Sequence, residues 1–168
     1  MLFQELMLEE PDKLNASLYE RFMDLSGTER VRQSHHFGGR FENIYMEEAD
    51  IPDIATVLNV VRQQAGQLLG IPADTLKAGF WFNAMEAGHR TTLHHHDEND
   101  ELLSAVYYIR VPENSGDLIL HDGDRKVSIQ PQEGKLVMFS PAQLHEVTAH
   151  LGSGLRLSVA MNVGPVDA

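Results

Sequence analysis

The chain has 168 residues, which is enough for one domain with a sizeable hydrophobic core. Its 25 acidic and 13 basic residues give a net charge of -12 with histidine neutral, which argues against a nucleic-acid phosphate backbone or an anionic membrane as the main partner. It contains no cysteine, which excludes disulfide bonds and thiolate metal ligands and fits a reducing compartment.

The N-terminal third has the apolar spacing of two amphipathic helices. In the first helix, apolar residues recur every three to four positions at Leu14, Leu18, Phe22 and Leu25. A second helix is predicted from near Pro52 to Leu69, because Pro suits a first turn and Gly70 a helix end. Between them, the alternating segment 40–46 predicts an edge or outer strand. The N-terminal residues lack a basic region and a long apolar run, so we expect no signal peptide and a cytoplasmic location.

From Lys77 onward, short segments rich in Val, Ile, Leu and aromatic residues alternate with turn residues, which is typical of β-strands. Besides a segment through the histidine cluster, the predicted strands are 77–85, 103–111, 117–121, 126–130, 135–140, 144–149 and 155–163. About eight strands after two helices predict a mainly β fold, an antiparallel jelly roll with flanking α-helices. We expect one domain over 1–168, with residues 1–76 as helical support containing one strand and residues 77–163 as the β core.

The run His94-His95-His96-Asp97, followed much later by His145, predicts a metal site. Side chains two residues apart on a strand point the same way, and a distant histidine on a neighbouring strand can complete the group. Two or three imidazoles, with or without a carboxylate, suit Fe(II) and leave coordination positions open. The alternatives are a polar surface loop for the cluster and a hydrogen-bonded core histidine for His145.

A second group of residues predicts an anion site. Arg156, Ser158 and Ala160 share one face of a predicted strand, and an arginine among Leu and Val is costly to bury without an anion. The alternative is an ion pair with one of the many carboxylates. Tyr107 and Tyr108 must point to opposite faces of their strand, so one of them should reach the interior of the β core.

The remaining histidines have no such partners in the sequence. We expect mostly surface or structural roles for them, with His35 and His36 as weak candidates for pocket residues. These histidines are His35, His36, His89, His121 and His150.

The order of these motifs resembles the 2-oxoglutarate- and Fe(II)-dependent oxygenase superfamily. It is most similar to bacterial and phage oxygenases with the pattern Trp-x-Asn, Gly, His-x-His and Ser-Gly-Val-Tyr-Tyr, over roughly residues 80–163. The matching segments are Trp81-Phe82-Asn83, Gly88, His94-His95-His96, Ser104 to Ile109, Val111-Pro112, Ser115-Gly116, His145-Glu146-Val147 and Arg156-Leu157-Ser158 through Asn162. The resemblance implies a cupin-like double-stranded β-helix.

The resemblance also implies the metal ligands. The closer relatives' His-x-His pattern gives Fe(II) bound by His94, His96 and His145. The wider superfamily's His-x-Asp pattern gives an alternative register, with His95 and Asp97 as the early ligands. His96 with Glu98 is a third reading. A site of three imidazoles would lack the usual carboxylate and would be more cationic.

For the co-substrate, the resemblance implies 2-oxoglutarate held by Arg156, with Tyr108, Ser158 and Asn83 as further binding residues. The expected activity is a dioxygenase reaction that hydroxylates a C–H bond and releases succinate and CO₂. The substrate is expected to be a small molecule or a peptide, and the chain could act as a homodimer.

Two other functions stay open from the sequence. The spacing of Gly88, His94, His96 and Glu101, with His145 later, is also similar to cupins that bind a metal without 2-oxoglutarate, either as dioxygenases or as small-molecule binders. A degenerate site that serves as a non-enzymatic scaffold is the third reading.

Overall fold

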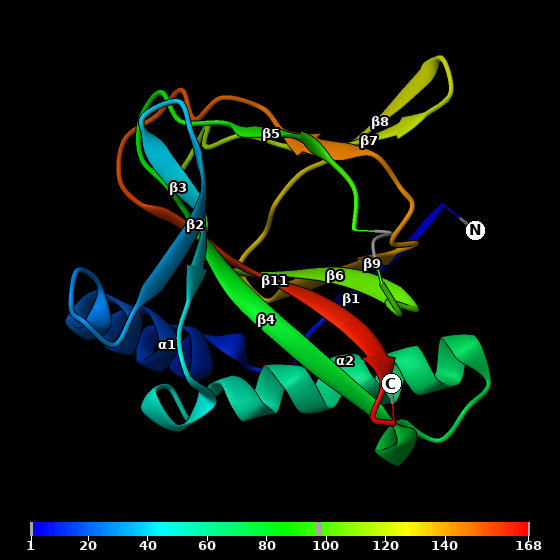
Figure 1. The fold of residues 1–168 in the computed structure, drawn as a ribbon. Helices are drawn as coiled ribbons and strands as arrows, with labels where there is room; N and C mark the ends of the chain where they lie inside the picture. The colour runs from blue at the N-terminus through cyan, green and yellow to red at the C-terminus, as the bar shows by residue number, and fades with distance from the viewer. Residues whose placement is uncertain (1, 97–98, 168) are drawn as a thin grey trace.

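The structure is a computed structural model, and it describes residues 2–96 and 99–167. Within these residues, strands form a seven-stranded and a four-stranded antiparallel sheet, and two α-helices lie below the larger sheet (Figure 1). The helices are α1 (Pro11–Leu25) and α2 (Ile54–Leu69), with short 3₁₀ turns at Glu48–Asp50 and Ala73–Thr75. No helix in this part of the chain has the length and apolar character needed to cross a membrane.

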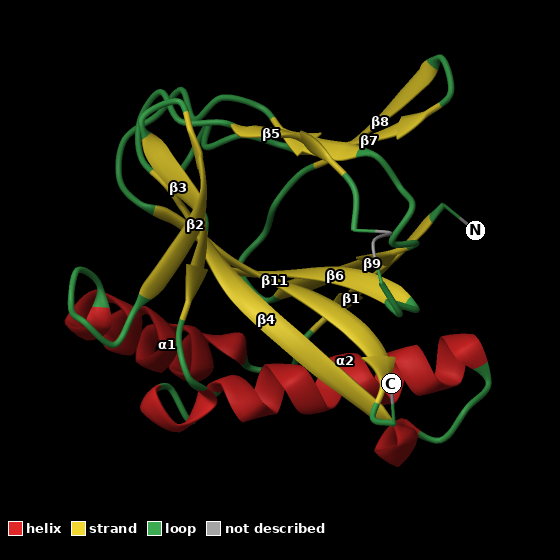
Figure 2. Ribbon diagram, viewed as in Figure 1, coloured by secondary structure: helices red, strands yellow, loops and turns green. Residues whose placement is uncertain are grey.

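The larger sheet has the strand order β1-β9-β6-β11-β4-β3-β2, and the smaller sheet has the order β5-β10-β7-β8. Figure 2 shows the smaller sheet facing the long strands of the larger one, with the helices on the opposite side. The strands of the larger sheet are β1 Phe3–Met7, β2 Arg32–Phe37, β3 Arg40–Tyr45, β4 Leu76–Met85, β6 Leu103–Arg110, β9 Lys135–Phe139 and β11 Arg156–Pro165. Those of the smaller sheet are β5 Thr91–His94, β7 Leu118–Asp122, β8 Arg125–Ile129 and β10 His145–Val147.

This arrangement confirms the predicted mainly β jelly roll with N-terminal flanking helices. The long strand β11 pairs along its length with β4 on one side and β6 on the other, so it forms the centre of the larger sheet. The two strands that flank it, β4 and β6, are thus far from β11 in the sequence. Such long-range pairing brings residues from both ends of the β region to one surface.

The larger sheet buries both of its faces, and the alternation of side chains decides which residue reaches which face. On the helix side, Leu18 and Phe22 of α1 and Val61 of α2 pack against Phe82 and other strand residues. On the side of the smaller sheet, a second apolar cluster includes Tyr108. Tyr107 belongs to the helix side, where its hydroxyl donates to Asn15 Oδ1 at 2.6 Å.

Residues 1–76 contain more β structure than the one strand predicted. Strand β1 pairs with β9 at the edge of the larger sheet, and β2 forms a hairpin with β3. The β2 sequence, Arg-Gln-Ser-His-His-Phe, is mostly polar and exposed, so it lacks the apolar alternation on which strand prediction depends. The hairpin turn at Gly38 and Gly39 has positive φ angles at both residues, as a tight two-residue turn requires.

Candidate metal centre

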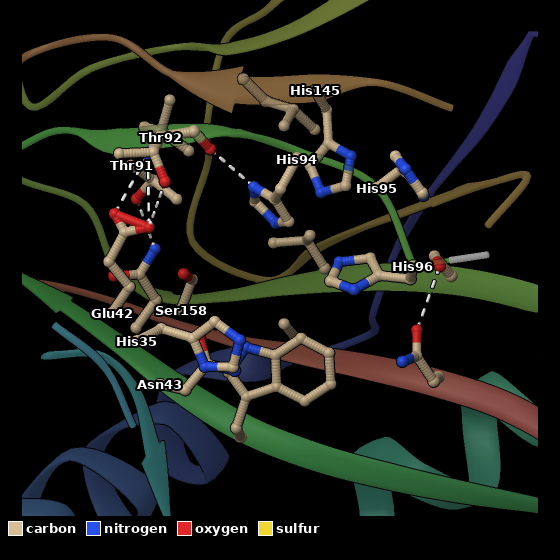
Figure 3. Close-up of a pocket in the computed structure, with 18 of the residues that line it drawn as sticks. His35, Glu42, Asn43, Thr91, Thr92, His94, His95, His96, His145 and Ser158 are labelled. Atoms are coloured by element: carbon tan, nitrogen blue, oxygen red, sulfur yellow. Dashed lines mark hydrogen bonds between the residues drawn. The ribbon is translucent and has the colours of Figure 1, made fainter. Parts of the chain in front are cut away.

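A cavity of about 340 Å³ lies between the two sheets and is lined by residues of both sheets and of the β2–β3 hairpin. His94 closes it at the end of β5, and His145 at the start of β10. Arg156, Ser158 and Ala160 line it from β11, as the shared strand face predicts. Figure 3 shows the histidines above the strands of the larger sheet, with Glu42, Thr91 and Thr92 at one end.

His94, His96 and His145 form one group in which a ligand nitrogen from each lies within 4.8 Å of the others. His94 and His145 are direct partners in the antiparallel β5–β10 pair, which brings their ring centroids to 4.1 Å. His96 follows the end of β5, where its backbone N–H donates to the Pro141 carbonyl at 2.8 Å. The structure therefore brings together three residues that the sequence places up to fifty-one positions apart.

Backbone carbonyls fix the tautomers of two of these imidazoles. His94 Nδ1 lies 2.6 Å from the Thr92 carbonyl, and His145 Nδ1 lies 2.8 Å from the Gln143 carbonyl. A carbonyl oxygen can only accept, so Nδ1 carries the proton in each ring. Nε2 is then left with a free lone pair, as a metal ligand requires.

Two of the three rings, His145 and His96, are kept neutral by burial. Burial, together with charge repulsion from the neighbouring His94, lowers the pKa of His145 to about 3. Burial and His94 likewise lower the pKa of His96 to about 4. A neutral imidazole is the form that binds a metal, so these two residues are in their ligand form at neutral pH.

Arg156 and Tyr108 lie deeper in the cavity and have unpaired polar atoms. Arg156 is 1% exposed, and its Nη2 donates to the Gly116 carbonyl at 3.4 Å. Its guanidinium carbon lies 5.3 Å from the centre of the Tyr108 ring, and neither its Nε nor the Tyr108 hydroxyl has a hydrogen-bond partner of good geometry among the described residues. Burial lowers the pKa of Arg156 and raises that of Tyr108, and the interaction between the two side chains partly offsets both shifts. No described carboxylate forms an ion pair with Arg156, so the alternative of an internal ion pair lacks a partner in this part of the chain.

Ser158 and Asn83 lie at the same level of the cavity wall, because they are partners in the β11–β4 pair. Both polar ends of the Asn83 side chain are already engaged. Its Oδ1 accepts from Arg40 Nη1 at 2.9 Å, and its Nδ2 donates to Thr91 Oγ1 at 2.7 Å. Asn83 therefore belongs to the hydrogen-bonded wall, and Ser158 is the freer of the two to contact a ligand.

The alternative ligand registers are only partly visible. His95 also lines the cavity, but Asp97 and Glu98 lie outside the described residues, so the choice of register stays a prediction. Glu101, the residue on which the cupin spacing depends, lines the cavity and accepts the Asn99 backbone N–H at 2.9 Å. It is not part of the metal-ligand group found among the described residues.

The β2–β3 hairpin adds cavity residues, of which the sequence indicated only His35, as a weak candidate. Glu42, Asn43 and Tyr45 line the cavity from β3, and His35 lines it from β2. His35 has a left-handed backbone with φ 60, which is uncommon for a residue other than glycine. His35, a weak candidate for a pocket residue, thus does line the cavity. Nothing in the local sequence around Glu42 indicated that its carboxylate would lie there.

Comparisons with known proteins agree with this geometry. Residues 79–162, half of the chain, match the model of the family described as "Putative 2OG-Fe(II) oxygenase". No curated protein matches the sequence.

Among solved structures, the chain is similar to a Pseudomonas putida prolyl-4-hydroxylase, with 18% identity over 97% of this chain and 92% of the other and a TM-score of 0.69. It is also similar to SnoK, a non-heme alpha-ketoglutarate-dependent carbocyclase of nogalamycin biosynthesis, with 13% identity over 97% and 79% of the two chains and a TM-score of 0.75. A viral collagen prolyl hydroxylase from Paramecium bursaria Chlorella virus-1 gives 15% identity over 99% and 97% and a TM-score of 0.65. At these identities the structural likeness shows the fold.

Proposed function

The chain belongs to the family of 2-oxoglutarate- and Fe(II)-dependent oxygenases, and from this premise we propose that it hydroxylates a C–H bond of a small-molecule or peptide substrate. In the balanced reaction, 2-oxoglutarate, O₂ and the substrate R–H give succinate, CO₂ and R–OH. One oxygen atom of O₂ enters succinate and the other enters the product. The two electrons from the oxidative decarboxylation and the two from the C–H bond together reduce O₂.

The observation that carries the proposal is the presence, in one cavity, of a three-imidazole group and a buried arginine that forms no ion pair with a described carboxylate. The residues fit both groups that the reaction needs. Imidazole nitrogens suit Fe(II), and three of them leave positions for further ligands. A buried guanidinium without a described carboxylate partner suits an anionic end of a co-substrate. A metal binder without 2-oxoglutarate would give Arg156 no anionic partner.

In this proposal each group of residues has a distinct task. His94, His96 and His145 would hold Fe(II), which when bound supplies the activation of O₂ for C–H oxidation. Arg156 would bind the distal carboxylate of 2-oxoglutarate, and the Tyr108 hydroxyl would donate to the same carboxylate. A neighbouring structure of this fold, the epimerase SnoN, has been solved with Fe³⁺ and alpha-ketoglutarate, which supports the same ligand pair here.

Apolar side chains would keep water from the co-substrate end of the cavity. Leu118, Phe139 and Val147 line it and belong to the apolar cluster between the sheets. In such surroundings the charge-assisted bond of Arg156 is stronger than it would be in water. The protein thus orients 2-oxoglutarate between a fixed cation and the imidazole group.

The test is an anaerobic titration of 2-oxoglutarate into protein loaded with Fe(II), followed by a succinate-release assay in air. We expect a visible charge-transfer absorbance on titration and succinate formation that depends on iron. Iron content is measured on the same preparation, so that an unloaded sample is recognised. A fully loaded protein that gives neither the absorbance nor succinate would contradict the proposal.

A further inference from the structure

We propose that Glu42 is a positioning residue for the metal centre, acting through Thr92 on His94. The inference rests on the metal site of the proposed function, and it adds a determinant from outside the segment that matches the family. Glu42 lies on β3 and His94 on β5, and these strands belong to different sheets. The side chains that connect them are visible at the left of the cavity in Figure 3.

The Glu42 carboxylate is buried, accepts hydrogen bonds from one residue of β5 and forms an ion pair with one neighbouring cation. It is 5% exposed. The backbone N–H of Thr92 donates to Oε2 at 3.0 Å, and the Thr92 hydroxyl donates to Oε1 at 2.8 Å. Arg40 Nη2 lies 4.0 Å from Oε2. A buried carboxylate is costly unless such donors satisfy it, so the contact has a definite geometry and is not an incidental surface pair.

The same threonine holds the metal-site imidazole. The Thr92 carbonyl accepts the His94 Nδ1 proton at 2.6 Å, which sets both the tautomer and the orientation of that ring. Glu42 fixes the N–H and hydroxyl of Thr92, and Thr92 fixes His94 through its carbonyl. The carboxylate is therefore two hydrogen bonds away from the imidazole, without touching it.

β5 needs this support because it is short and has a strand on one side only. It lies at the end of the smaller sheet, and its pairing with β10 contains an irregularity between His145 and Val147. On the other side, Arg40 Nη2 donates to the Arg90 carbonyl at 2.9 Å, two residues before Thr92. Backbone groups two residues apart are those that a neighbouring antiparallel strand would bind. The side chains of Arg40 and Glu42 take the place of that missing strand.

A titration of the metal-free protein with Co(II), which reports its ligand geometry by visible absorbance, tests the inference. We expect Glu42→Ala to weaken Co(II) binding about 10- to 100-fold and to change the absorbance spectrum, as the loss of a group that orients a metal ligand typically does. Thr92→Val removes only the hydroxyl donor and should lose less. Because both changes act on one contact, the double variant should lose less than the two single losses combined.

Glu42→Gln is the matched control, because it removes the negative charge but keeps a side-chain oxygen that can accept from Thr92. We expect it to change Co(II) affinity less than Glu42→Ala does and to keep the wild-type spectrum. Wild-type affinity and spectrum in Glu42→Ala would overturn the inference. Equal losses in Glu42→Ala and Glu42→Gln would also overturn it, because the effect would then be one of charge alone.

Two further outcomes separate this inference from the proposed function. Wild-type protein that binds Co(II) but not 2-oxoglutarate would contradict the proposed function and leave the role of Glu42 to be decided by the variants. Wild-type protein that binds no Co(II) would overturn both. If Glu42→Ala does not fold, Thr92→Val decides the question: unchanged Co(II) affinity together with unchanged hydrogen exchange of the backbone amide at position 92 would overturn the inference.

Discussion

His94 and His145 are direct partners across the antiparallel β5–β10 pair, although they are fifty-one positions apart in the sequence. Their ring centroids lie 4.1 Å apart, and each donates its Nδ1 proton to a backbone carbonyl. Two neighbouring rings with the same tautomer present two free Nε2 atoms to the same cavity. This relationship makes the pair the core of the proposed metal site.

Replacement of His145 by alanine should abolish iron binding while the protein stays folded, because the variant loses one of three proposed ligands but keeps β10. Equilibrium dialysis with Fe(II) measures the binding, and circular dichroism checks the fold. His121→Ala is the control, since His121 pairs with Glu146 at 3.0 Å and is not in the group of three. Full iron occupancy in His145→Ala would remove this residue from the site.

The two ligand registers predict opposite results for one pair of variants. If His94 and His96 bind the metal, His94→Ala should lose iron and Asp97→Ala should mostly keep it. Iron content after reconstitution under identical conditions distinguishes them. Loss of iron in Asp97→Ala together with retention in His94→Ala would establish His95 and Asp97 as the early ligands.

Arg156→Leu should weaken 2-oxoglutarate binding far more than iron binding. Removal of one partner of a buried ion pair costs roughly 3–5 kcal/mol, so the affinity should fall by about two to three orders of magnitude. Without ligand, the variant should be as stable as the wild type or more so, because an unpaired buried guanidinium is itself costly. Anaerobic titration and thermal unfolding measure the two effects. An unchanged affinity would exclude Arg156 as the carboxylate partner.

The metal-free protein should become less stable as the pH falls below about 6.5. The pKa of His145 is about 3 in the folded protein, so below pH 6.5 the unfolded chain binds a proton that the folded chain excludes. At pH 5 this one group should lower the free energy of unfolding by roughly 2 kcal/mol relative to pH 7. Denaturant unfolding at both pH values measures it. His145→Gln should lose less stability over the same interval, and an equal loss would contradict the assignment.

The sequence was sufficient for the elements whose patterns are local. The helices have an apolar residue every three to four positions, and the strands after Lys77 alternate or form short apolar runs, so both were predicted close to their observed bounds. Strand alternation predicted that Tyr107 and Tyr108 point to opposite faces, and the structure shows that Tyr108 lies on the cavity side and Tyr107 on the helix side. The expected group of His94, His96 and His145 required a non-local pairing, which the resemblance to known oxygenases supplied.

The rest depends on contacts that no local pattern encodes. β1 and β2 are edge strands with mostly polar or exposed residues, and their backbone pairing decides their structure. Glu42 contacts Thr92 across fifty positions, so neither residue stands out in its own segment. His35 lines the cavity and has a left-handed backbone conformation, which the local sequence does not predict.

The contacts of Arg40 and Glu42 also mean that the proposed metal centre cannot simply be cut out of the chain or transferred to another protein. The segment that matches the family begins at residue 79, so a fragment trimmed to that boundary would keep every proposed ligand and lose both of these side chains. Its β5 would then have an open edge, and such edges recruit strands from other molecules. Transfer or truncation of the centre therefore requires the N-terminal hairpin, and a library of chimeras should place its crossover before Arg32 instead of at residue 79.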